Sequence, residues 1–105
     1  MDMSVDLLAF GPHPDDIEIG IGGTVSKQAR CGHRVGLCDL TRGELGSNGT
    51  VDERRSEAEA GAEVLGAAWR ENLEWPDGEI GGPDQLRSAV ECLRRNRPAT
   101  VLIPH

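Results

Sequence analysis

Residues 5–16 read VDLLAFGPHPDD, and they carry the clearest structural signal of the chain. The first six are apolar apart from one acid, which predicts a buried β-strand at residues 5–10. Pro14 fixes its own φ and favours extended backbone at the preceding residue, so the strand is expected to end in a stiff turn. The polar side chains of that turn are one imidazole and two carboxylates, from His13, Asp15 and Asp16.

The rest of the chain alternates between short apolar runs and segments with helical periodicity. Strands are expected at residues 34–40 and 100–103, with a further short element at residues 69–73. Helices are expected at residues 18–31, 50–65 and 84–97. Strands separated by helices imply right-handed crossovers and a parallel sheet covered on both faces. We therefore expect an α/β fold, a Rossmann-like three-layer α/β/α sandwich with a mainly parallel sheet.

Three polar segments follow expected strands. The turn at His13 follows the first strand, a Gly-rich loop at residues 41–49 follows the second, and His105 follows the last. In open parallel sheets, ligands bind beyond the carboxyl ends of the strands, where the strand order reverses. The three segments are therefore expected at one edge of the sheet, which favours a functional site there.

The turn at His13 allows more than one interpretation. Catalytic zinc usually takes three His, Asp or Glu ligands and keeps one open position, and a nearby carboxylate can serve as a base. Alternatively, Asp15 and Asp16 simply cap a helix. A third interpretation, a dinucleotide fingerprint at residues 20–23, is weak because Val25 stands where the third glycine belongs and the acidic turn would repel a pyrophosphate.

Composition excludes several classes of function. The chain has 105 residues and a net charge of -7, with 18 acidic against 11 basic residues, which argues against nucleic acid or an anionic membrane as a partner. Its three cysteines form no C-x-x-C pair, so neither a disulfide framework nor a cysteine-type zinc site is indicated. Cys31 and Cys38 lie in apolar contexts and are expected to be buried free thiols. No signal peptide or membrane span is evident, so we expect a cytoplasmic protein.

Several segments together resemble a known family. Residues 10–18, FGPHPDDIE, resemble the His-Pro-Asp-Asp signature of the PIG-L/LmbE-type zinc-dependent N-acetylglucosamine deacetylases. Residues 15–20, 37–41 and 47–50, together with Arg54, resemble the branch that makes bacillithiol by deacetylating N-acetylglucosaminyl malate. The resemblance runs over essentially all 105 residues.

That resemblance implies a function and roles for particular residues. It implies zinc as the cofactor, with His13 and Asp16 as ligands, and Asp15 as the general base. Arg54 would bind the acidic portion of the substrate. The expected partner is a small-molecule N-acetylglucosamine conjugate, not nucleic acid or membrane, and the complete form is expected to be a homo-oligomer.

The chain departs from the family pattern at its end. Family members continue into a His-Pro-Asp-His motif that supplies the third zinc ligand, whereas this chain stops at Pro104-His105. We therefore expect residues 1–105 to be the N-terminal part of a single deacetylase domain, with apolar surface exposed around residues 101–103. Two alternatives stay open: a deacetylase of another N-acetylglucosamine conjugate, of the mycothiol type or general, and an incomplete Rossmann-like fragment that only binds metal or a partner.

Overall fold

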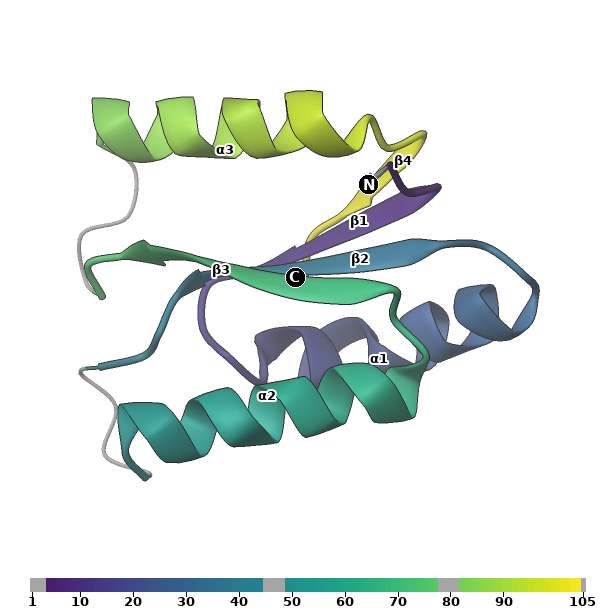
Figure 1. Ribbon diagram of the computed structural model, residues 1–105, viewed down its shortest axis with the longest axis horizontal. Coiled ribbons are helices and arrows are strands. Elements are labelled where there is room, and N and C mark those ends of the chain that lie inside the picture. The colour runs from purple at the N-terminus through teal and green to yellow at the C-terminus, as the bar shows by residue number, and fades with distance from the viewer. Residues whose placement is uncertain (1–3, 45–48, 78–81, 105) are drawn as a thin grey trace.

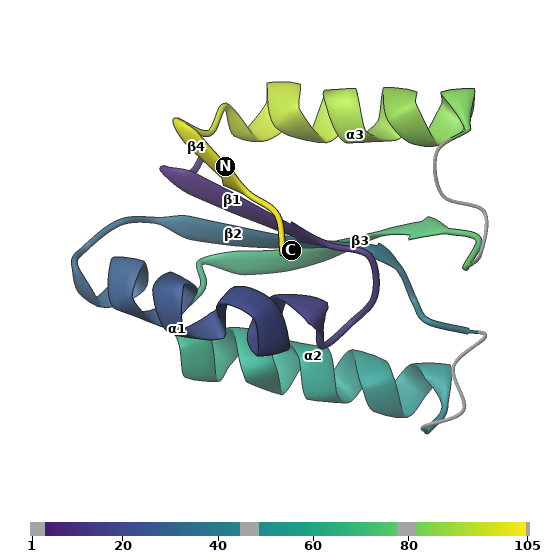
Figure 2. The ribbon, with the colours of Figure 1, turned by 180° about the vertical axis from the view of Figure 1, so that it is seen from behind.

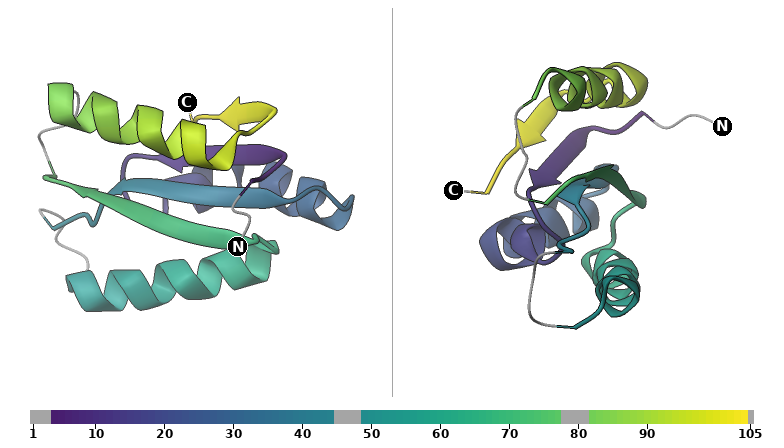
Figure 3. Two further views of the ribbon diagram at one scale, coloured as in Figure 1. Left: turned by 45° about the horizontal axis from the view of Figure 1, so that its top comes forward. Right: turned by 90° about the vertical axis from the view of Figure 1, so that its left-hand side faces the viewer.

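The computed structural model describes residues 4–44, 49–77 and 82–104, and its centre is a four-stranded parallel sheet (Figure 1). The strands are β1 (Leu7–Gly11), β2 (Val35–Thr41), β3 (Trp69–Trp75) and β4 (Thr100–Leu102). They lie side by side in the order β3-β2-β1-β4, which the left panel of Figure 3 shows. The chain thus steps from β1 outward to β3 and then crosses to the other side of β1, so the strand order reverses at β1.

Three helices cover the two faces of this sheet. Helices α1 (Asp16–Arg30) and α2 (Val51–Leu65) lie on one face, and α3 (Pro83–Asn96) lies alone on the other (Figures 1 and 2). The end-on view in the right panel of Figure 3 shows the three layers directly. The expected three-layer α/β/α fold is therefore confirmed.

Local sequence explains where the helices begin and end. Thr50 caps α2, because its side chain accepts a hydrogen bond of 3.1 Å from the backbone N–H of Glu53, and Gly66 ends that helix in the left-handed region at φ 80°. Helix α1 begins at Asp16, two residues before the expected start, because Asp15 already occupies the N-cap position. The helix is kinked at Ile21, whose φ of −138° is not helical and which lies between Gly20 and Gly22.

The sheet separates two apolar clusters because successive side chains of a strand point to opposite faces. One cluster lies between the sheet and the helix pair α1 and α2, and its buried members are Leu7, Ala9, Ile17, Val25, Val35, Leu37 and Ala62. The other lies under α3 and contains Val5, Leu8, Cys38 and Cys92. Neighbouring residues of β2, Leu37 and Cys38, thus belong to different clusters.

Some expectations need correction. Cys31 is exposed at the end of α1, and it is not the buried thiol that its context predicted, whereas Cys38 is fully buried. The short element expected at residues 69–73 is a full strand that reaches Trp75. As expected, the apolar end of the chain is open to solvent, since Val101 on the edge strand β4 is 41% exposed and Ile103 is 72% exposed.

Candidate functional site

His13 stands in the turn that follows β1, at the carboxyl edge of the sheet. Its Nδ1 lies 3.3 Å from Oδ2 of Asp16, and that same oxygen accepts a hydrogen bond of 2.9 Å from the backbone N–H of His13. Its Nε2 lies 2.7 Å from Oδ1 of Asp77. The imidazole is therefore held between two carboxylates while its side chain stays 40% exposed.

Asp15 adopts a strained backbone next to the imidazole. It is the N-cap of α1 with φ 92°, in the left-handed region where a residue with a Cβ costs about 1–3 kcal/mol. Its side chain makes no capping hydrogen bond. The interpretation in which the side chain of Asp15 caps the helix is therefore wrong. Its carboxylate instead lines an open cleft together with His13 and Asp16.

Asp77 is the site residue that the sequence did not reveal. It follows β3 within a Pro-Asp-Gly stretch that indicates only a turn. Its side chain is 8% exposed, and its backbone N–H donates a hydrogen bond of 2.7 Å to Glu44, which ties this turn to the loop after β2. That hydrogen bond also lowers the pKa of Glu44. The rule that strands of a parallel sheet end at one edge was the signal that could have identified Asp77.

The loop after β2 positions Arg54 beside this turn. Thr41 donates hydrogen bonds of 3.0 Å from both its backbone N–H and its hydroxyl to the carbonyl of Pro12, which joins the loop to the turn at His13. Gly43 has φ 69°, and a Cβ at this position would collide with the guanidinium of Arg54. Gly43 is thus favoured by its left-handed backbone conformation, and a side chain at this position would displace the guanidinium of Arg54.

The side chains around His13 line an open cleft of about 430 Å³. The four site residues expected from the sequence all line it, and they are His13, Asp15, Asp16 and Arg54. Asp77 completes its wall. Ser47, Asn48 and His105, which the sequence also indicated, lie outside the described residues. We call His13, Asp15, Asp16 and Asp77 the edge cluster.

The charge around His13 is negative. Burial alone would lower the pKa of His13, but the hydrogen bonds and charges of Asp77 and Asp16 outweigh it and raise the pKa above the usual value. The same acidic surroundings suit a divalent cation. Two ligands at about 2.0–2.2 Å on a tetrahedral zinc ion are about 3.4 Å apart, close to the 3.3 Å between Nδ1 of His13 and Oδ2 of Asp16.

A buried ion pair lies between the sheet and helices α1 and α2. Arg70 on β3 donates to both carboxylate oxygens of Asp39 on β2, at 2.6 and 2.8 Å, and to Glu18 of α1 at 2.9 Å. Burial lowers the pKa of Arg70, but the two carboxylates raise it more, so the guanidinium stays charged. These residues join β2 and the edge strand β3 to α1.

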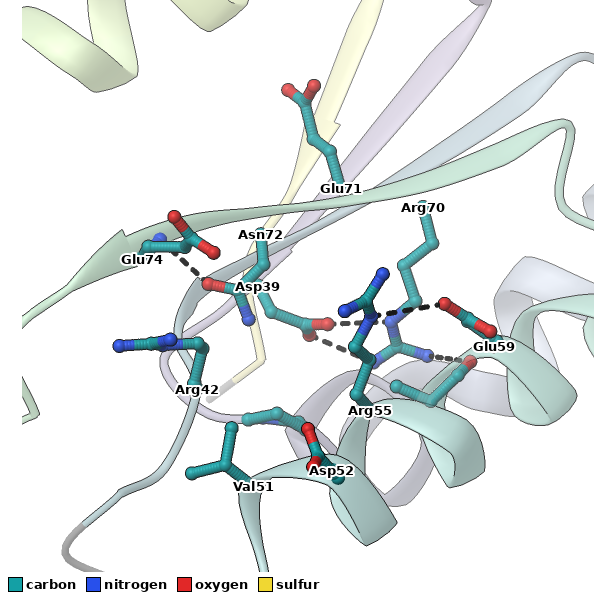
Figure 4. Close-up of a pocket in the computed structure, with 12 residues that line it drawn as sticks. Asp39, Arg42, Val51, Asp52, Arg55, Glu59, Arg70, Glu71, Asn72 and Glu74 are labelled. Carbon is teal, nitrogen blue, oxygen red and sulfur yellow. Dashed lines mark hydrogen bonds and ion pairs between the residues drawn. The ribbon is translucent and has the colours of Figure 1, made fainter.

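A second hollow of about 350 Å³ opens above this ion pair, between β3 and α2 (Figure 4). Asp39 and Arg70 form part of its wall, and the exposed pair of Arg55 and Glu59 lies beside it on α2. Pro14 lines both this hollow and the cleft of the edge cluster. The two spaces are therefore neighbours across the turn that carries His13.

Known proteins resemble this chain in sequence and in fold. Diacetylchitobiose deacetylase of Thermococcus kodakarensis is 35% identical over 106 residues, covering 93% of this chain and 40% of that protein. The conserved protein TT1542 of Thermus thermophilus matches with a TM-score of 0.87 and 45% identity, covering 92% of this chain and 44% of that one. The 4-carboxy-2-hydroxymuconate hydratase GalB of Pseudomonas putida matches with a TM-score of 0.79 and 29% identity, covering 90% and 45%.

The chain spans less than half the length of each of these proteins. Within the described residues, no helix is long and apolar enough to cross a bilayer. The model of the PIG-L family, described as GlcNAc-PI de-N-acetylase, matches residues 8–105, which include most of β1, the edge cluster and every later element. The chain therefore belongs to the PIG-L family.

Proposed function

We propose that the protein hydrolyses the N-acetyl group of an N-acetylglucosamine conjugate and depends on zinc. One observation carries the proposal: His13 and Asp16 present ligand atoms 3.3 Å apart, and the carboxylate of Asp15 lines the same cleft without serving as a helix cap. Hydrolysis of an amide needs an electrophile and a base at one place, and these residue types can supply both.

We assign His13 and Asp16 as zinc ligands. Zinc held there would act as a Lewis acid on the acetamide carbonyl and lower the pKa of water. The role of Asp77 is to orient His13: in the tautomer with its proton on Nε2, the imidazole donates to Asp77 and directs the lone pair of Nδ1 toward the side of Asp16. Asp77 is thus a positioning residue.

Asp15 acts as the general base. It would take a proton from the attacking water, and the amine would leave after protonation. Its backbone strain favours a catalytic role over a structural one, because such strain persists where the surroundings hold a residue in a working geometry.

Arg54 supports a substrate that carries a carboxylate. It contributes a guanidinium to a cleft whose other charged residues are acidic, apart from His13. A substrate carboxylate would be repelled by the acids and attracted by Arg54, which suits planar, bidentate recognition. We therefore propose N-acetylglucosaminyl malate, the bacillithiol precursor, as the substrate, with these residues forming the N-terminal part of a single deacetylase domain.

A hydratase is the second candidate, since GalB shares 29% identity with this chain. Both reactions activate water, but a hydratase adds it to a carbon–carbon double bond and releases no acetate. The third candidate is a deacetylase of another N-acetylglucosamine conjugate, such as the mycothiol type. It would differ from the proposed enzyme only in the part of the substrate, beyond the N-acetylglucosamine, that faces Arg54.

The test uses the full-length protein that contains these residues, loaded with zinc. It is incubated with N-acetylglucosaminyl malate, with methyl N-acetylglucosaminide and with an unsaturated dicarboxylate. We expect acetate from both sugars, faster from the malate conjugate, and no hydration. Hydration of the dicarboxylate without acetate release from either sugar would contradict the proposal in favour of the hydratase.

A further inference from the structure

A second group of ligand-type side chains lies on the opposite face of the sheet, under α3. Its members are Cys38 of β2, Glu71 of β3 and Cys92 of α3, which we call the thiol cluster. Among the described residues, these three place one ligand atom each within 4.8 Å of one another. Figure 4 shows Glu71 leaving β3 on the side opposite Arg70, so the cluster is separated from the ion pair by the sheet.

The distances within the thiol cluster suit a single metal ion. The sulfur atoms of Cys38 and Cys92 are 4.0 Å apart, and Cys92 donates to Oε1 of Glu71 at 2.9 Å. Two thiolates at about 2.3 Å on a tetrahedral ion are about 3.8 Å apart, so both sulfurs could ligate without backbone movement. A disulfide needs about 2.05 Å, half the observed separation, so oxidation would require the pair to close up.

The surroundings of the thiol cluster also suit a cation. Both cysteines are fully buried, whereas the side chain of Glu71 is 25% exposed and leaves a route from solvent. Arg95 donates to Glu71 at 3.1 Å, and Nδ2 of Asn96 lies 3.3 Å from the sulfur of Cys92. The other polar atom of that buried amide, Oδ1 of Asn96, has no hydrogen-bond partner in the described structure, so the polar contacts beside Cys92 are incomplete.

We propose that Cys38, Cys92 and Glu71 form a binding site for one thiophilic divalent cation of the zinc or cadmium type, separate from the edge cluster. Two thiolates and one carboxylate carry three negative charges, which the cation and Arg95 balance. Binding breaks both S–H bonds, releases the two protons to solvent, and forms two metal–sulfur bonds and one metal–oxygen bond.

The proton balance predicts how binding depends on pH. Metal binding requires Cys38 and Cys92 to give up their thiol protons, and the hydrogen bond with Cys92 together with burial raises the pKa of Cys38. The cation must displace these protons, and its apparent affinity should therefore increase as the pH rises.

The test is a titration of the reduced, metal-free 105-residue chain with Cd²⁺ under anaerobic conditions. Bound cadmium thiolate is detected by its charge-transfer absorption in the ultraviolet. We compare the parent with Cys38→Ser, Cys92→Ser and the control Cys31→Ser, which alters the exposed third cysteine. A His13→Ala/Asp16→Ala double variant removes the ligand pair of the edge cluster.

We expect one equivalent of cadmium with the thiolate band in the parent, in Cys31→Ser and in the double variant. The band should be lost in Cys38→Ser and Cys92→Ser, and Glu71→Gln should weaken binding by roughly 10-fold or more. Cadmium should also slow the alkylation of two of the three thiols of the parent well below the rate that burial alone gives in the metal-free chain, which keeps the test informative if a serine variant fails to fold.

A parent without the thiolate band would overturn the proposal, and so would a band that depends on Cys31. Bound cadmium without a thiolate band, lost in the double variant, would assign the cation to the edge cluster and overturn the proposal. Because the detected signal comes from sulfur, failure of this site is distinguishable from failure of the proposed deacetylase activity.

Discussion

The edge cluster and the thiol cluster differ in how far solvent reaches them. The edge cluster stands on turns beyond the ends of β1 and β3, with His13 40% exposed beside an open cleft. The thiol cluster lies between the sheet and α3, with both cysteines fully buried. Catalytic metal sites keep an open position for water or substrate, whereas structural sites are closed. One small sheet thus provides both an open setting, at its edge, and a closed setting, on its face.

The geometry of the sheet accounts for this difference. Within β2, Asp39 faces the α1 and α2 side and Cys38 faces α3, because side chains alternate along a strand. Beyond the strand ends, the backbone is free to turn, and its polar groups face water. Chemistry that needs access is therefore expected at the edge.

The largest loss of stability should come from removing the buried guanidinium of Arg70. Arg70→Ala leaves Asp39 buried without its partner, and breaking such a pair costs about 3–5 kcal/mol of unfolding free energy. Denaturant unfolding monitored by circular dichroism measures this loss. Arg55→Ala is the matched control, since its exposed pair with Glu59 should contribute only about 0.3–0.5 kcal/mol. Equal losses in both variants would refute the structural role of the buried pair.

Arg54→Ala should weaken substrate binding without removing zinc. A guanidinium paired with a substrate carboxylate contributes about 1.5–3 kcal/mol, so KM for N-acetylglucosaminyl malate should rise about 10-fold to 150-fold. KM for a neutral N-acetylglucosamine glycoside should change little. If both substrates lost the same amount, Arg54 would have no role in carboxylate recognition.

Asp77→Asn should have a smaller effect that distinguishes positioning from catalysis. Loss of the carboxylate that orients a metal-binding histidine costs about 10- to 100-fold in metal affinity. Turnover at saturating zinc should recover most of the parent rate, because Asp77 does not touch the reacting atoms. Zinc affinity measured by competition with a chelator tests the first expectation. An unchanged affinity would show that His13 is oriented by other contacts.

Much of the fold could be predicted from the sequence, but the inward face of α3 only in part. The apolar periodicity of residues 84–97 predicts that Leu86, Val90 and Leu93 face inward. Leu93 does pack against the apolar cluster under α3, whereas Leu86 is 65% exposed. The face toward the sheet also carries Ser88, Cys92 and Asn96, spaced by four, and Ser88 accepts a hydrogen bond from Trp75. Two of these are polar, so a search for apolar residues misses the stripe that they form.

The candidate site could be predicted only in part, because some of its residues carry a signal in the sequence and others do not. His13, Asp15, Asp16 and Arg54 carried their own signals in the sequence, and the cleft brings them together. Asp77 could not be identified because Pro-Asp-Gly is common in turns, so an aspartate there is already explained by the turn and does not indicate a further role for its carboxylate. The thiol cluster was missed because its members are separated by 21 residues or more in sequence, and only the packing of β2, β3 and α3 brings them together.

Zinc content and acetate release in full-length His13→Ala and Asp15→Asn separate the roles of the zinc ligand and the base. His13→Ala should lose the zinc of the edge cluster together with activity, because a catalytic ion is held poorly when one of its ligands is removed. Asp15→Asn should retain zinc like the parent and lose about 10²- to 10⁴-fold in turnover, because only the base is gone. Equal acetate release in Asp15→Asn and the parent would show that Asp15 is not the base, and undiminished zinc at this site in His13→Ala would show that His13 is not a ligand.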